Sequence, residues 1–121
     1  MRDSNKMIGT FEGKPETLRC FQYIDSYIRP LGGVETEVKS QISYKVFRKF
    51  LWMWSYEKTA DGTLFLSFLL DRKIENNFIH GVSQVSKNRW NHSAVIKSAE
   101  DAQCDELKNT LLQSYRFASQ K

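Results

Sequence analysis

FRKFLWMWSYEKTADGTLFLSFLLDRK, residues 47–73, is the part of this chain that sets its architecture. The aromatic run 47–56 and the apolar run 64–70 are both rich in residues that favour β-strands. The segment 59–62, Thr-Ala-Asp-Gly, lies between them and has a composition typical of a turn. The stretch therefore predicts an antiparallel hairpin at the centre of the fold.

Amphipathic helices are predicted on both sides of the strands. The first begins at Pro15, where the missing N–H costs nothing in an opening helical turn, and runs to about Arg29. The second begins at a capping Ser98 and runs nearly to the C-terminus. Apolar residues recur three to four positions apart in each: Leu18, Phe21, Ile24 and Ile28 in the first, and Cys104, Leu107, Leu111, Tyr115 and Ala118 in the second.

The remaining strands follow from alternation with a period of two. Residues 34–46 predict one long bent strand or two short ones, and 79–85 with 89–96 predict a last strand pair. We therefore expect an α+β domain of two layers, α-β(about 5)-α, with an antiparallel sheet and both helices on one face. Residues 14–119 are expected to form this single domain. Residues 1–13 are expected to be a flexible lead-in, except that Phe11 packs on the core.

The central hairpin is apolar on both of its faces. Antiparallel strands with one face in water normally alternate apolar and polar residues. Either the sheet curls so that its far face is partly covered by itself, or that face meets a partner. Trp52 and Trp54 share one side of their strand, and core packing, a binding platform and a dimer contact are the alternatives for them.

Positive charge is concentrated in the strands. The chain of 121 residues has a formal net charge of +4. Ten basic and four acidic residues lie between Lys39 and Lys97, so this segment holds +6 and the rest of the chain −2. Such an asymmetry favours an anionic partner, nucleic acid above all.

The sequence lacks the motifs of common enzyme classes. His80 and His92 are the only histidines, and neither belongs to a nucleophile motif. Cys20 and Cys104 fall on the apolar stripes of the predicted helices, and no cysteine or histidine has the spacing of metal ligands. We therefore expect no enzyme, no cofactor and no metal site.

No membrane or secretion signal is readable either. The longest apolar run, 64–70, is far shorter than the roughly 20 residues that a membrane-spanning helix needs. The N-terminal sequence MRDSNKMIGTFEGK contains no apolar segment of a signal peptide. We expect a cytoplasmic protein without a membrane partner.

One cluster has the chemistry of recognition, Arg89-Trp90-Asn91-His92 with Lys87 before it. On a strand, Trp90 and His92 share one face while Arg89 and Asn91 share the other. Arg, Lys and Asn contact phosphates and base edges, and an aromatic ring can stack on a base. The alternative is that Trp90 is a core residue and Arg89 an edge charge that prevents aggregation.

Several of these motifs resemble a known family. Phe11-Glu12-Gly13-Lys14, residues 39–50, the aromatic hairpin and Arg89–His92 followed by the last helix resemble an uncharacterised bacterial family, domain of unknown function 5655, over residues 10–119. More distantly, a strand ending in Trp before a capped Asp-Glu-Leu…Leu…Ser-Tyr helix is similar to the YjbR-like (MmcQ-like) superfamily. That similarity implies a compact α+β fold, frataxin-like in outline, for which double-wing DNA binding has been proposed. The resemblance marks a candidate surface at Lys39, Ser43, Arg48, Phe50, Arg89 and His92.

Three hypotheses follow for the function. The leading one is a non-catalytic binding module whose basic sheet surface holds nucleic acid weakly and without strong sequence preference, with Lys39, Ser43, Arg48, Arg89 and His92 as the candidate binding residues. The second is a protein-interaction or self-associating domain, such as a homodimer, that uses the apolar hairpin face. The third is a small-molecule pocket near Arg48, Arg89 and His92.

Overall fold

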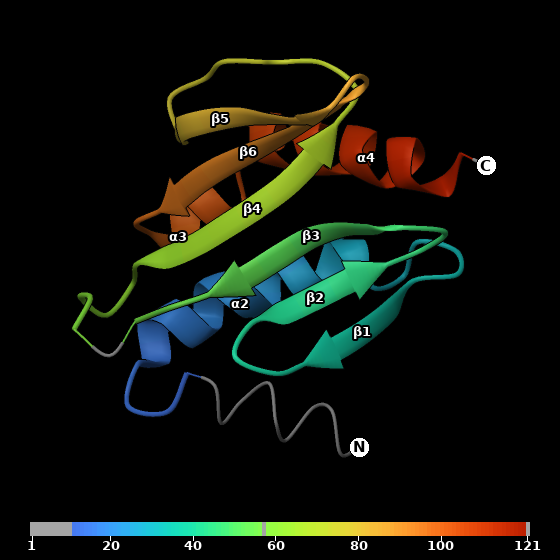
Figure 1. Ribbon diagram of the computed structural model, residues 1–121. Helices are drawn as coiled ribbons and strands as arrows, with labels where there is room; N and C mark the ends of the chain where they lie inside the picture. Colours follow the sequence, from blue (N-terminus) through green and yellow to red (C-terminus); the bar gives the residue numbers. More distant parts are fainter. Residues whose placement is uncertain (1–10, 57, 121) are drawn as a thin grey trace.

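The computed structural model describes residues 11–56 and 58–120. Helix α2 spans Pro15–Ile28, and a short helix α3, Ala99–Ala102, precedes α4, Asp105–Ser119. The strands between them are β1 Glu35–Val38, β2 Ile42–Lys45, β3 Lys49–Trp54, β4 Leu64–Leu70, β5 Ile79–Ser86 and β6 Arg89–Ile96. The helices lie on one face of the sheet (Figure 1), which confirms the predicted two-layer α+β class.

The six strands form one antiparallel sheet in the order β1-β2-β3-β4-β6-β5. Strands β1 to β4 lie side by side in their sequence order. The chain then passes to the far edge for β5, and β6 returns between β4 and β5. Residues 34–46 form two short strands, with a turn in which the Lys39 amide donates to the Gln41 carbonyl at 3.0 Å, so the sheet has six strands instead of about five.

A carboxylate from the β3–β4 connection caps the start of α2. Asp61 Oδ1 accepts hydrogen bonds from the backbone amides of Glu16 at 2.9 Å and Thr17 at 3.0 Å. These amides lack partners inside the helix, and Lys14 at the N-cap supplies no side-chain acceptor. Gly62, at a φ of 100° that favours glycine, donates its amide to Thr17 Oγ1 at 2.8 Å. Hydrogen bonds therefore connect the β3–β4 turn to the first turn of α2.

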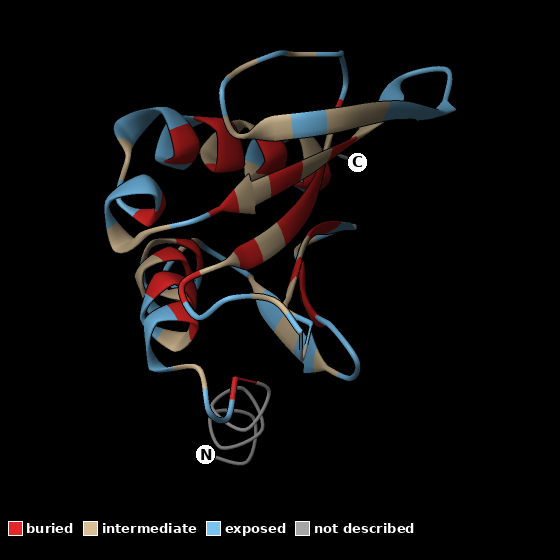
Figure 2. Ribbon diagram, turned by 90° about the vertical axis from the view of Figure 1, so that its left-hand side faces the viewer, coloured by how far each residue is buried: buried red, intermediate tan, exposed pale blue. Residues whose placement is uncertain are grey.

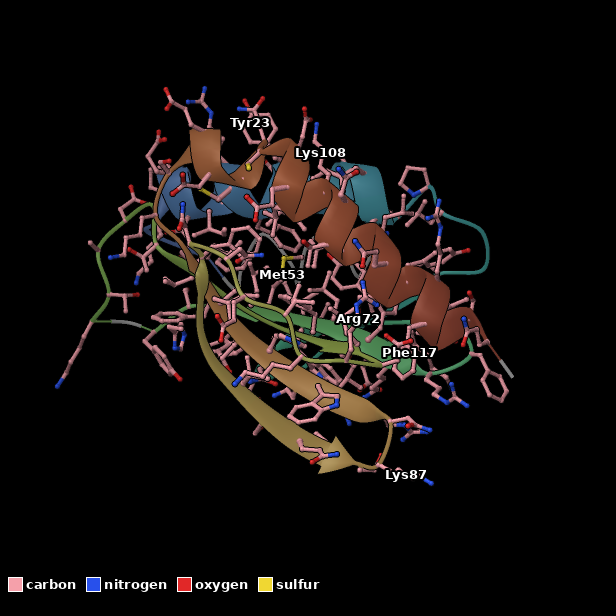
Figure 3. All side chains as sticks on the ribbon, turned by 90° about the horizontal axis from the view of Figure 1, so that it is seen from above. Tyr23, Met53, Arg72, Lys87, Lys108 and Phe117 are labelled. Atoms are coloured by element: carbon pink, nitrogen blue, oxygen red, sulfur yellow. The ribbon has the colours of Figure 1, made fainter. Side chains whose placement is uncertain are left out.

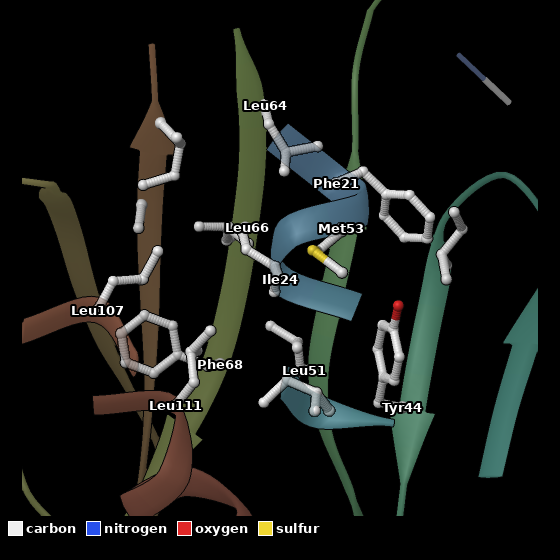
Figure 4. Packing of buried hydrophobic residues seen from close by; sticks show 14 of the residues in the cluster. Phe21, Ile24, Tyr44, Leu51, Met53, Leu64, Leu66, Phe68, Leu107 and Leu111 are labelled. Atoms are coloured by element: carbon white, nitrogen blue, oxygen red, sulfur yellow. The ribbon is translucent and has the colours of Figure 1, made fainter. Parts of the chain in front are cut away.

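The core lies between the helices and the facing side of the sheet (Figure 4). On β4 the residues Leu64, Leu66, Phe68 and Leu70 are fully buried, while the residues between them face the other side. Leu107 and Leu111 of α4 lie beside Phe68, and Ile24 of α2 lies beside Leu66. Figure 2 shows the same division, with buried positions on the helix sides that face the sheet and exposed positions on their outer sides.

A β-bulge carries Phe50 into the core. As β2 advances from Tyr44 to Lys45, β3 moves from Leu51 to Lys49, so Phe50 is an extra residue. Phe50 and Leu51 are both fully buried, and the Phe50 ring meets the Tyr115 ring of α4 at 5.9 Å. Phe50 is therefore a core residue, and the prediction that it belongs to the candidate surface is wrong.

The continuous helix predicted from Ser98 is wrong in one respect. Ser98 Oγ does cap a helix, accepting from the Asp101 amide at 3.2 Å, but that helix ends at Ala102. Cys104 has extended backbone with ψ 133°, and α4 begins after it. The first turn of α4 carries Asp105 and Glu106, whose charges complement the helix dipole and favour a new start at this point.

The expected lead-in is described only in part, because residues 1–10 lie outside the described residues. Phe11 is 2% exposed, and its ring lies 5.0 Å from that of Phe21. No helix in the described part of the chain combines the length and the apolar character needed to cross a membrane.

Candidate nucleic-acid interface

Four segments that are distant in the sequence meet at one end of the molecule. Figure 1 shows the β2–β3 connection, the end of β4, the β5–β6 turn and the C-terminal end of α4 at this end. A hollow of about 560 Å³ lies between them, and we call it the cationic hollow. Phe117 on α4 and Lys87 at the β5–β6 turn mark two of its sides in Figure 3. Its lining residues are Arg48, Asp71, Ser86, Lys87, Asn88, Arg89, Phe117 and Gln120.

Arg48 is held in the cationic hollow by the end of α4. Its amide donates to the Ala118 carbonyl at 3.2 Å, and its Nη1 donates to the Gln120 carbonyl at 3.0 Å. The guanidinium also lies over the Phe47 ring, 5.1 Å from the ring centre. A cation at a helix C-terminus is stabilised by the helix dipole. The side chain is therefore positioned before any ligand arrives.

The charges of the cationic hollow favour an anion. Arg48, Lys87 and Arg89 are positive, and Asp71 is the single acidic residue of the lining. Asp71 is paired with Arg72, whose Nη1 lies 2.9 Å from its carboxylate, so its charge is already balanced. Lys87 and Arg89 have no ion-pair partner within the described part of the chain. The hollow therefore keeps positive charge for a ligand.

A second hollow lies on the sheet face that the helices leave uncovered. It has a volume of about 440 Å³, and we call it the open-face groove. Its lining residues are Gln41, Trp52, Trp54, Ser67, Leu69, Val85, Asn91 and Ser93. Trp52 and Trp54 do share one face, as the alternation predicts, and both are half-buried. The far face of the hairpin is thus only partly covered by its own chain.

The linings of the two hollows are adjacent in the sequence at three places on the sheet. Asn91 of the groove and Arg89 of the cationic hollow lie two residues apart on one side of β6, and Asp71 follows directly after β4, which carries Leu69 of the groove. On β5, Val85 of the groove precedes Ser86 of the cationic hollow. Because residues two apart on a strand are separated by about 6–7 Å, positive charge begins where the uncharged groove ends.

The other candidate residues on the sheet lie apart from these hollows. Lys39 is exposed in the β1–β2 connection, at the end of the sheet opposite to Arg48 (Figure 1), and its Nζ lies 3.7 Å from Glu37. Ser43 faces the open side beside Trp52, yet it is only 5% exposed. The structure brings Arg48 and Arg89 together but does not bring Lys39 to them.

His92 is a core residue. It lies on the helix side of β6, fully buried, while Asn91 faces the open-face groove. Its Nε2 accepts from the Ile74 amide at 3.1 Å, and its Nδ1 donates to the Trp90 carbonyl at 3.1 Å. Burial lowers the pKa of His92 below its ordinary value. The prediction of a pocket near Arg48, Arg89 and His92 is therefore wrong for His92, which is buried in the core and does not line the cationic hollow.

Several residues of the open-face groove were not selected from the sequence. Ser67 Oγ donates to Asn91 Oδ1 at 2.6 Å and joins β4 to β6 in the floor of the groove. Ser67 is the one polar residue in the apolar run 64–70, and that break marks the uncovered face. Asn91 belongs to the recognition cluster that the sequence indicates, but only the strand order places it beside Ser67.

The described residues contain no group of three or more His, Cys, Asp and Glu side chains that could hold a metal ion. Cys20 is buried, and Cys104 is half-buried between α3 and α4. The chemistry available at the two hollows is therefore that of cations, amides, hydroxyls and aromatic rings.

One family model matches the chain. It is described as Domain of unknown function (DUF5655) and covers residues 7–118, nearly the whole sequence. No curated protein and no solved structure matches this chain.

Proposed function

This chain is a member of the DUF5655 family, and because that description assigns no function, we propose one from the geometry of its own residues. The domain is a non-catalytic binding module for nucleic acid, located in the cytoplasm. It holds the phosphate backbone in the cationic hollow, weakly and without strong sequence preference. The similarity to the YjbR-like superfamily, for which DNA binding has been proposed, supports the same class of partner.

The observation that carries this proposal is that Arg48 and Arg89 line one hollow. Arg48 lies in the β2–β3 connection and Arg89 at the start of β6, and Lys87 joins them from the β5–β6 turn. Guanidinium groups form paired hydrogen bonds with phosphate oxygens, and lysine contributes a point charge. Three cations around one hollow suit consecutive phosphates better than a single small anion.

Titration of fluorescently labelled oligonucleotides at two salt concentrations tests the proposal. Phosphate contacts release counterions, so the affinity should fall steeply with salt, and the dissociation constant should be about 10⁻⁴–10⁻⁶ M at physiological salt. Arg89→Ala should weaken binding about equally for all sequences and reduce the salt slope by about one. Arg19→Ala is the matched control, because Arg19 is an exposed arginine on α2, away from both hollows.

The proposal fails if the wild-type domain shows no binding at high micromolar concentration and low salt. It also fails if Arg89→Ala and Arg19→Ala change the affinity equally, because the cationic hollow would then have no special role.

Self-association through the uncovered sheet face is the second candidate function. Tyr56 and Val85, exposed by 56% and 60%, extend the apolar surface at the groove. Exposed apolar patches on proteins often mark interfaces. Sedimentation at micromolar concentration tests this candidate, since apolar association should hold or strengthen in salt while nucleic-acid binding weakens. A strict monomer at all salt concentrations excludes it.

A further inference from the structure

The open-face groove owes its shape to one large side chain beside small ones. The register places Trp52 of β3, Ser67 of β4 and Ser93 of β6 in one row across the sheet, ending at Gly81 of β5. The two serines, which line the groove, leave space beside the indole of Trp52. The resulting volume of about 440 Å³ falls within the range of ligand pockets, about 300–1,000 Å³.

The lining of the groove is uncharged and combines flat apolar surface with amide and hydroxyl groups. Trp54 stacks on Phe65, with ring centres 6.0 Å apart and an interplanar angle of 18°. Trp52 has no ring partner within the described residues, so its indole is the ring left for a ligand. This combination suits a planar, uncharged heterocycle.

The Asn91 amide is placed to recognise the edge of such a heterocycle, and a buried donor without an acceptor belongs to another lining residue, Trp54. Asn91 Oδ1 accepts from Ser67, which orients the amide and leaves its N–H groups to donate elsewhere. The indole Nε1–H of Trp54 is buried and has no acceptor in the described part of the chain. Buried donors without acceptors are rare in folded proteins, and this one lies in a residue that lines the groove.

We propose that the open-face groove receives one unpaired base of a single-stranded nucleic acid. The base stacks on Trp52, and the Asn91 amide hydrogen-bonds its edge. The inference rests on the proposed function, because the strand's phosphates lie in the adjoining cationic hollow. Arg89 and Asn91 are two residues apart on one side of β6, so phosphate and base contacts are separated as they are within a nucleotide.

Charge explains why the occupant is a single strand. The groove itself is neutral, and the positive residues begin at its end. A neutral base joined to an anionic phosphate matches that division. In a duplex the bases are stacked and paired inside the helix, so none can enter the groove without being extruded at a cost. Stacking tolerates every base, which agrees with weak sequence preference.

The test compares three labelled probes of equal length at one low salt concentration. The probes are a thymine single strand, the same backbone without bases, and a duplex. The wild-type domain should bind the single strand about tenfold more tightly than the abasic strand, the loss typical of one stacked base. Tryptophan fluorescence should be quenched by the single strand and not by the abasic one.

Variants assign that preference to the groove. Trp52→Ala should remove the preference for bases while leaving the affinity for the abasic strand unchanged, and Trp52→Phe should keep part of it. Tyr23→Ala is the matched control, because Tyr23 is a half-buried aromatic residue on α2, which lies on the other face of the sheet from the groove. Asn91→Ala should weaken the single-strand complex without changing the abasic one.

Two outcomes overturn the inference and are distinguishable. Equal affinity for single strand and abasic strand, together with a salt slope that Arg89→Ala reduces, removes the base site and leaves the proposed function standing. No binding of any probe removes both. The comparison of probes needs only the wild-type domain, so it decides the question even if Trp52→Ala does not fold.

Discussion

The imidazole of His92 lies parallel to the ring of Phe68, with the ring centres 5.1 Å apart and an interplanar angle of 3°. This contact joins β6 to β4 inside the core. The same imidazole accepts the Ile74 amide, which belongs to the segment between β4 and β5. His92 thus fixes the crossing by which the chain reaches the edge of the sheet, a structural role that needs the neutral ring.

Acid should destabilise the domain through His92. Protonation would place an N–H on Nε2, opposite the Ile74 N–H, so the two donors would face each other. Because burial lowers the folded-state pKa, the unfolded chain takes up a proton first as the pH falls below about 6.5. The free energy of unfolding should be highest above that pH and should decrease as the pH falls towards the folded-state pKa.

Urea unfolding at several pH values between about 7.5 and 5 measures this effect. His92→Phe should be less stable overall. Its free energy of unfolding should depend less steeply on pH in this range, by the contribution of about one proton. An unchanged slope in His92→Phe would contradict the assignment.

Removing the side chain of Leu107 should weaken the packing of α4 on the sheet. Leu107 is fully buried beside Phe68, as Figure 4 shows, and truncation leaves a cavity there. Leu107→Ala should lower the free energy of unfolding by about 2–5 kcal/mol. Asn109→Ala, at an exposed position of the same helix, should change it by no more than about 0.5 kcal/mol. Equal stability of the two variants in denaturant titration would show that α4 is misplaced.

Asp61 should stabilise the fold although its side chain is exposed. Its carboxylate accepts the amides of Glu16 and Thr17, so Asp61→Ala leaves the start of α2 uncapped. The expected loss is about 0.5–2 kcal/mol, as for an N-cap residue. Asp61→Asn keeps an acceptor oxygen and should lose less. Glu75→Ala is the exposed control, and thermal unfolding that ranks it with Asp61→Ala would refute the cap.

Replacing Arg48 or Arg89 should weaken binding in both cases, but only the replacement of Arg48 should lower the stability of the domain. Arg48 Nη1 donates to the Gln120 carbonyl, whereas Arg89 is exposed at the β5–β6 turn. Arg48→Ala should therefore lower both the melting temperature and the affinity for oligonucleotides. Arg89→Ala should lower the affinity and leave the melting temperature within experimental error. A normal affinity for Arg48→Ala, measured below its melting temperature, would remove Arg48 from the interface.

The periodicity of the sequence determined the elements and the faces that their residues share. Spacings of three to four predicted α2 and α4, and alternation predicted the strands and the shared side of Trp52 and Trp54. These patterns are local, because each depends on a few consecutive residues. The concentration of positive charge between Lys39 and Lys97 was also readable from the sequence alone.

Tertiary structure decided which of these residues meet. Alternation placed Trp90 and His92 on one face, but only the packed helices show that this face is the core. The bulge that buries Phe50 and the cap that Asp61 supplies to α2 depend on partners distant in the sequence. The meeting of Arg48 with Arg89 requires β6 to return beside β4 and α4 to end against the β2–β3 connection. Such contacts form between segments that are distant in the sequence, and the local periodicity of each segment does not specify which other segment it packs against.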